Sequence, residues 1–219
     1  MQSRTTRRKF ITTILKLFAV TIGVFSFRKN KRNLIKKNKN ISSTSKSTIS
    51  NNKLLIAYES QFGSTEEVAK FIANNLAVNG QVVEIRKICE VDDLSSYKNV
   101  IIGSAIQYDN WMPEAREFII RNENELATKS VNFFLVCLVL SKKGEKAVKK
   151  ANGYAIKTMN LVPKLKVNSF GKFAGVLDYS KMSFGQKILA KIIFAIIGVA
   201  EGDYRDWAAI KNWTKKLNF

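Results

Sequence analysis

The sequence predicts an α/β fold: a doubly wound, five-stranded parallel sheet with helices on both faces. From Lys53 onward, short apolar runs alternate with segments whose apolar residues recur at helical spacing. Such alternation indicates parallel strands joined by crossover helices, which cover both faces of the sheet. The region 53–219 also has the size of a single α/β domain.

Each predicted strand is short and mostly apolar, as expected for strands buried on both faces. The strands are expected at 54–58, 82–85, 100–104, 131–140 and 170–177. Helical patterns fall at 65–78, 111–126 and 142–160. Because ligands of such sheets bind beyond the carboxyl ends of the strands, the loops that leave those ends are the candidate site.

The first of these loops is rich in hydroxyl groups and is predicted to bind a phosphate. Its residues are Ser60, Gln61, Phe62, Gly63, Ser64 and Thr65. The first turn of a helix offers unpaired N–H groups and a partial positive charge, and Gly63 lets a ligand approach the backbone. No Lys or Arg lies between Tyr58 and Ala69, so neutral donors are expected to hold the anion. An alternative is an ordinary turn in which Ser64 or Thr65 caps the helix.

Ser60, Gly63 and Thr65 match the pattern Thr/Ser-x-Thr-Gly-x-Thr, so the loop resembles the phosphate loop of flavodoxins. That resemblance implies flavin mononucleotide (FMN) as cofactor, with its 5′-phosphate in the loop, and a flavodoxin-like fold. Phe62 stands where flavodoxins usually have a hydroxyl residue, so only its backbone N–H would serve there.

Two later stretches occupy the positions that hold the flavin ring in flavodoxin-like proteins. The second loop comprises Ser104, Ala105, Ile106, Gln107, Tyr108, Asp109, Asn110 and Trp111. Tyr108 and Trp111 offer flat faces for stacking, although Trp111 fits equally well as a hydrophobic staple on its own helix. The third stretch is assigned by position alone and comprises Leu138, Val139, Leu140 and Ser141.

The C-terminal segment 202–213 is similar to the closing helix of the flavodoxin subfamily that includes menaquinone-dependent protoporphyrinogen oxidase (dehydrogenase). This similarity implies an FMN-dependent oxidoreductase that passes electrons between an organic substrate, porphyrinogen-like by precedent, and quinone. A membrane-tethered flavodoxin that carries electrons between protein partners is the alternative. A binding module without flavin is a third reading, because Phe62 replaces a hydroxyl residue.

The composition excludes several kinds of chemistry. The chain has no histidine, which removes the commonest metal ligand and general base. Its two cysteines, Cys89 and Cys137, suggest neither a metal site nor a disulfide. We therefore expect no metal and name no catalytic side chain, because a flavin would carry the redox chemistry.

The N-terminus differs sharply from the domain. Residues 1–53 hold 14 Lys or Arg and no acid, whereas the other 23 basic residues face 17 acidic ones. The stretch 6–11, Thr-Arg-Arg-Lys-Phe-Ile, looks like a twin-arginine export signal, and 18 mostly apolar residues follow from Phe10 to Phe27. We predict a signal or membrane anchor at 1–27, a basic disordered linker at 28–52 and the FMN-binding domain at 53–219.

Three readings of the N-terminal segment stay open, and all three attach the domain to membrane lipid. We expect export by the twin-arginine route, which would carry a folded, flavin-loaded domain out of the cytoplasm, with anchoring at the cytoplasmic face as the alternative. However, seven positive charges lie between Arg28 and Lys39 against four between Arg4 and Lys9, which favours the domain at the cytoplasmic face. A basic tail lying on anionic lipid is the third possibility. The apolar run favours membrane over nucleic acid as partner.

The segment 181–200 combines Lys181, Lys187 and Lys191 with long apolar side chains. It is too short and too basic to span a bilayer. It fits a helix on a membrane surface, or one lining access to a lipid-soluble quinone. The alternative is a helix packed against the sheet near its last strand.

Overall fold

The computed structural model describes residues 53–218, and the predicted signal, anchor and linker at 1–52 lie outside them. The strands of the main sheet are β1 (Leu54–Glu59), β2 (Val83–Lys87), β3 (Asn99–Gln107), β4 (Asn110–Trp111), β5 (Ser130–Cys137) and β6 (Val167–Ala174). The helices are α2 (Ser64–Val78), α3 (Pro113–Arg121), α4 (Glu123–Leu126), α5 (Glu145–Met159), α6 (Phe184–Ile197) and α7 (Trp207–Lys215). Short 3-10 turns are η1 (Ile88–Glu90), η2 (Leu138–Ser141) and η3 (Tyr179–Lys181).

Five of these strands are parallel, in the order β2-β1-β3-β5-β6, which confirms the predicted sheet. Strand β4 adds to β3 as a short antiparallel hairpin, with Gln107 opposite Asn110. The strand order changes direction between β1 and β3, because the chain passes from β1 to β2 on one side and then crosses back to β3 on the other. That topological switch point is where ligands bind in sheets of this kind.

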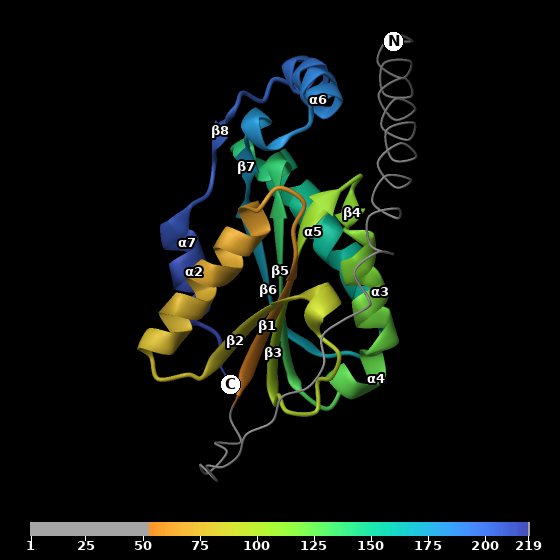
Figure 1. Cartoon of the computed structure of the whole chain (residues 1–219), viewed down its shortest axis with the longest axis vertical. Helices are drawn as coiled ribbons and strands as arrows, with labels where there is room; N and C mark the ends of the chain where they lie inside the picture. Colours follow the sequence, from red (N-terminus) through yellow and green to blue (C-terminus); the bar gives the residue numbers. More distant parts are fainter. Residues whose placement is uncertain (1–52, 219) are drawn as a thin grey trace, which may run out of the picture. The chain divides into compact units, whose positions relative to one another are not determined.

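Strand β1 is buried on both faces, because its side chains alternate between two cores. Leu55 and Ala57 join the core beneath α3 and α5, whereas Leu54 and Ile56 join the core beneath α2 and α7. Figure 1 shows the two pairs of helices on opposite sides of the sheet. This continuous burial explains why the strand reads as an unbroken apolar run.

Several boundaries differ from the sequence-based expectations. The fourth predicted strand ends at Cys137, because residues 138–141 turn into η2. The fifth ends at Ala174, and β7 (Val176–Leu177) instead pairs antiparallel with β8 (Gly202–Asp203). The helical pattern at 111–126 is divided. Trp111 belongs to β4, and α3 ends at Arg121, where the side-chain amide of the following Asn122 donates to the Phe118 carbonyl at 2.9 Å.

Helix α6 does not cover a face of the sheet, contrary to one reading of segment 181–200. It packs chiefly on η3, at the edge of the sheet where the parallel strands end (Figure 1). The small core under it contains Leu177, Tyr179, Ala190 and Val199. Of the helices within residues 53–218, none is long and apolar enough to cross a bilayer.

A glycine in the central strand β3 is required by close packing. A Cβ on Gly103 would lie 2.0 Å from the Cζ atom of Phe134, its neighbour on β5. The Phe134 ring is itself held between Phe173 and Trp213, with ring centroids 6.2 Å and 6.4 Å away. Neither the strand nor the ring has room to move aside, because protein interiors are close-packed.

Gly103→Ala is therefore expected to lower the free energy of unfolding by about 1–3 kcal/mol. Gly153→Ala is the matched control, because nothing lies within 4 Å of a Cβ at that helical position. It should raise the free energy of unfolding by about 0.5–1 kcal/mol, since alanine is the better helix former. Denaturant unfolding of the full chain measures both, and a Gly103→Ala protein as stable as the parent would contradict this packing argument.

Candidate functional site

The carboxyl edge of the sheet brings together the first two predicted stretches. The Gln107 side-chain amide donates to Gln61 Oε1 at 2.6 Å, so the loop after β1 and the end of β3 are in direct contact. The third stretch, η2, continues from β5, whose residue Val136 pairs with Ala105. Gly175 also lies at this edge, because a Cβ there would be 3.4 Å from Ser64 Oγ.

The loop after β1 has the backbone geometry of an anion cradle. Gly63 is the residue before α2 and has φ 87°, a left-handed conformation that favours glycine. Its N–H donates to Ser60 Oγ at 3.1 Å, which closes the loop. The first helical hydrogen bond runs from Glu67 N–H to the Gly63 carbonyl. The N–H groups of Ser64, Thr65 and Glu66 therefore precede the helical ladder, at the positive end of the helix dipole.

Two buried hydroxyls in this cradle lack a partner among the described residues. They are Thr65 Oγ1, on a side chain with no exposed surface, and Ser64 Oγ. Neither caps the helix, because the N-cap is Gly63 and no side chain caps it. An unsatisfied buried hydroxyl costs about 1–3 kcal/mol. A phosphate in the cradle would satisfy both hydroxyls, so the residues present fit the phosphate group of a flavin nucleotide.

The first turn of α2 carries two carboxylates that would repel an anion, and each is paired with a cation. The Arg205 guanidinium, 2.5 Å from Glu67 Oε2, holds the pKa of that carboxyl below its usual value, assisted by Lys181 at 3.3 Å. Lys70, 2.7 Å from Glu66, similarly lowers the pKa of Glu66. Arg205 is itself fixed by Asp203 and by stacking 4.5 Å from the Trp207 ring.

Lys181 is a cation beside the loop that the expectation of neutral donors alone did not include. Its Nζ lies 3.7 Å from the position that a Cβ on Gly63 would occupy. The sequence gives no local signal for this contact, because Lys181 is 114 positions from Glu67, its ion-pair partner beside the loop. The fold therefore adds one cation, paired with Glu67, to the edge of the cradle.

The hairpin turn between β3 and β4 is held in an uncommon backbone conformation. Tyr108 and Asp109 have φ of 50° and 62°. This left-handed conformation raises the conformational free energy of a non-glycine residue by about 1–3 kcal/mol. Helix α5 supports the turn: Tyr154 Oη donates to Asp109 Oδ1 at 2.5 Å, and Lys150 Nζ lies 3.0 Å from the same oxygen. Burial acts to raise the pKa of Asp109, but these partners lower it below its usual value.

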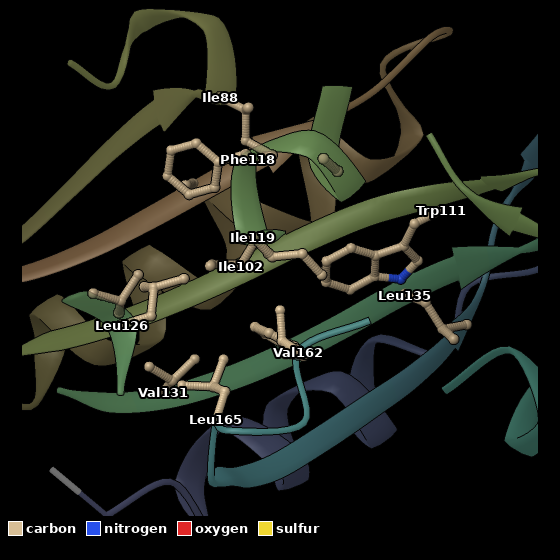
Figure 2. Close-up of a cluster of buried hydrophobic side chains, with 14 of the residues drawn as sticks. Ile88, Ile102, Trp111, Phe118, Ile119, Leu126, Val131, Leu135, Val162 and Leu165 are labelled. Carbon is tan, nitrogen blue, oxygen red and sulfur yellow. The ribbon is translucent and has the colours of Figure 1, made fainter. Parts of the chain in front are cut away.

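The polar turn residues are accessible, whereas Trp111 is not. Gln107, Tyr108 and Asn110 are half-buried and Asp109 is exposed. Trp111 is only 1% exposed, with its ring centroid 5.1 Å from Phe133 and 6.0 Å from Phe170. Figure 2 shows it inside the core among Ile119 and Leu135. Trp111 therefore has no free face for stacking, and it packs against the sheet.

The remaining predicted residues have mainly structural contacts. The buried Ser104 hydroxyl accepts from Met112 N–H at 3.0 Å and donates to the Ala105 carbonyl. Ile106, Val139 and Leu140 pack against the core under α3 and α5. The Ser141 hydroxyl donates to the Leu138 carbonyl at 2.7 Å. The part of the site open to a ring is thus the turn at 107–110, next to the cradle.

Comparisons with known proteins identify several that are similar to this chain. Curated relatives include the protoporphyrinogen IX dehydrogenase [quinone] of Escherichia coli strain K12, 25% identical over 169 residues, which covers 76% of this chain and 92% of that protein. The protein of the same name from Leishmania major is 28% identical over 177 residues, covering 74% and 72%. Among solved structures, oxidised Flavodoxin 2 from Bacillus cereus is 22% identical with a TM-score of 0.44, covering 66% of this chain and 99% of that one.

A family model described as a flavodoxin domain matches residues 55–203. That span runs from β1 to β8 and includes the cradle, the turn at 107–110 and η2. Because the match extends over more than half of the chain, this protein belongs to the flavodoxin domain family.

Proposed function

We propose that this chain is an FMN-binding oxidoreductase at the membrane, passing electrons between an organic substrate and quinone. The observation that carries the proposal is the pair of hydroxyls at the N-terminus of α2, on Ser64 and Thr65, that have no hydrogen-bond partner within residues 53–218. They follow Gly63 in the loop after β1, and this loop contacts the turn at 107–110 through the hydrogen bond between Gln61 and Gln107. A phosphate and an attached ring would therefore find complementary groups side by side.

Bound FMN would supply the electron-transfer chemistry, and the protein would position it. Ser60, Gly63, Ser64 and Thr65 would hold the phosphate, with Lys181 as the nearby cation. The turn at 107–110 would flank the ring, and Tyr108 is its one aromatic side chain. Burial raises the pKa of Tyr108, so its phenol stays neutral beside the ring.

The printed names of the curated relatives favour a porphyrinogen-like substrate and a quinone acceptor. Porphyrinogens carry carboxylates, which need cations. The turn at 107–110 contains no Lys or Arg, but α5 places Lys150 beside Asp109 and Lys157 Nζ 3.3 Å from Asn110 Oδ1. These two lysines would give an acidic substrate a counter-charge next to the ring.

A second candidate is an electron carrier that serves protein partners and binds no organic substrate. It is favoured by the chemistry of the turn, whose one titratable acid, Asp109, is engaged by Tyr154 and Lys150. Without a free acid or base at this point, proton transfer to or from a substrate would depend on the flavin and water.

Membrane attachment is proposed from the sequence of the N-terminal segment. The apolar run from Phe10 to Phe27, flanked by basic residues, supports an anchor in membrane lipid. The twin-arginine-like motif supports an exported domain, and the larger positive flank after the run supports the cytoplasmic face instead. A reporter enzyme that is active on only one side of the membrane, fused to the C-terminus of the chain, distinguishes an exported domain from one at the cytoplasmic face.

Thr65→Val should weaken FMN binding by about 10- to 100-fold, because a hydrogen bond to a charged group contributes about 1.5–3 kcal/mol. The same change should leave the FMN-free protein as stable as the parent or more so, since it removes an unsatisfied buried hydroxyl. Fluorescence titration with FMN and denaturant unfolding of the free protein test both halves. Unchanged FMN affinity would rule out this use of Thr65.

Lys181→Met should weaken FMN binding by no more than about fivefold, the effect of an exposed ion pair. The loss should shrink at high salt, which screens exposed charges. Lys149→Met, an exposed lysine on α5, is the control and should leave FMN affinity unchanged. An equal effect of the two variants would show that Lys181 acts only through the net charge.

The two candidate functions differ in one assay. The full chain loaded with FMN is mixed anaerobically with protoporphyrinogen IX and a soluble quinone, and porphyrin absorbance is followed. The oxidoreductase forms porphyrin only when FMN and quinone are both present. A carrier forms none, although its flavin is still reduced and reoxidised by chemical reagents.

A further inference from the structure

Helix α6 exposes a continuous apolar stripe. Its members are Phe184, Ile188, Ile192 and Ile196, which are 81%, 47%, 53% and 64% exposed. Their spacing of four residues places them on one face of the helix. The opposite side packs on the small core under α6 through Ala190 and Phe194. Large apolar side chains that are exposed together, and not singly, mark a contact surface.

The helix is shaped by local interactions that do not involve the stripe. Ser183 and Gln186 form a capping box at its N-terminus. At its C-terminus Gly198 has φ 66°, and the Lys142 ammonium donates to the Ile197 carbonyl. These contacts hold α6 in place while leaving the apolar stripe free for another surface.

Helix α6 carries two lysines, Lys187 and Lys191, and no acidic residue. The nearest acids in sequence, Asp178 and Glu201, flank the segment and accept from the N–H groups of Ser180 and Tyr179. An apolar helix face bordered by lysines, on a helix too short to span a bilayer, is the composition of an interfacial helix on anionic lipid. We infer that α6 docks the domain on an anionic bilayer surface, with its apolar stripe among the lipid headgroups and acyl chains.

Charge argues for lipid over a second copy of the chain. Pairing two α6 stripes would bring Lys187 and Lys191 of both copies together without any acidic residue of the helix to neutralise them. Such like-charge contacts oppose association. A bilayer offers both an apolar phase for the isoleucines and negative headgroups for the lysines.

Docking through α6 would bring the candidate flavin site to the membrane. Lys142 ties α6 to the end of η2, and η3, on which α6 packs, ends at Lys181 beside Gly63. The helix, η2 and the cradle lie at the same edge of the sheet (Figure 1). A lipid-soluble electron acceptor could then reach the flavin without leaving the bilayer. This consequence rests on the proposed function, but the docking itself needs no flavin.

A site-specific fluorophore in the full chain tests the docking separately from the N-terminal anchor. Cys89→Ser removes the exposed thiol, and an environment-sensitive dye is attached through Ile188→Cys. The matched control is a dye on Val78→Cys, 86% exposed at the end of α2 farthest from the site. Both proteins are reconstituted into vesicles of neutral lipid, or of neutral lipid mixed with phosphatidylserine, and FMN binding is measured independently.

With anionic vesicles, the dye at position 188 should show blue-shifted emission and quenching by brominated lipid, whereas the dye at 78 stays in water. Ile192→Glu in the same protein should abolish the blue shift. Lys187→Gln should reduce the ratio of inserted to free α6 by about fivefold in anionic vesicles, the effect of one lysine near a charged surface. Its effect in neutral vesicles should be small.

Three results would overturn the proposal. The dye at 188 could remain in water with every lipid. The two positions could respond equally, which indicates nonspecific adsorption. Finally, the emission at 188 could depend on protein concentration without vesicles, which would identify a second copy as the occupant. None of these depends on FMN, so failure of docking and failure of flavin binding are distinguishable.

Discussion

The burial of β1 on both faces is the constraint on which the rest of the site depends. Leu54 and Ile56 face one core, and Leu55 and Ala57 face the other, so the strand cannot shift without exposing one set. Its carboxyl end therefore delivers Gly63 and the first turn of α2 to a fixed point. Pairing with β3 then fixes the turn at 107–110 beside it. The position of the cradle is fixed because β1 is an interior strand, paired with β2 on one side and with β3 on the other.

The fold and the strand–loop–helix arrangement around Gly63 could be predicted because both depend on residues that are close together in the sequence. Apolar runs gave the five strands, and the spacing of Ser60, Gly63 and Thr65 indicated the loop. Boundaries were less accurate where a run stays apolar after the strand ends, as at Leu138–Ser141. The role of Trp111 could not be predicted either, because an aromatic residue beside a loop can face a ligand or the core. Its packing against Phe133 and Phe170 shows that it faces the core.

The charged surroundings of the site could not be predicted, because their partners are distant in the chain. Arg205 neutralises Glu67 across 138 positions, and Lys150 and Tyr154 reach Asp109 from another helix. Side-chain pairing of this kind follows from three-dimensional placement and leaves no local pattern. The orientation of α6 could not be predicted either. Its apolar residues fitted a helix packed against the sheet as well as one on a membrane surface, and the packed helix was the preferred interpretation; their exposure supports the surface role.

The central claim is that the loop after β1 binds the phosphate of a flavin nucleotide. Visible-absorbance titrations of the flavin-free full chain with FMN and with riboflavin, which lacks the phosphate, test it most directly. Two charge-assisted hydrogen bonds should make FMN bind more tightly than riboflavin by more than about a hundredfold. A perturbed flavin spectrum with that preference supports the account. Equal affinity for the two flavins, or no spectral change with either, would contradict it.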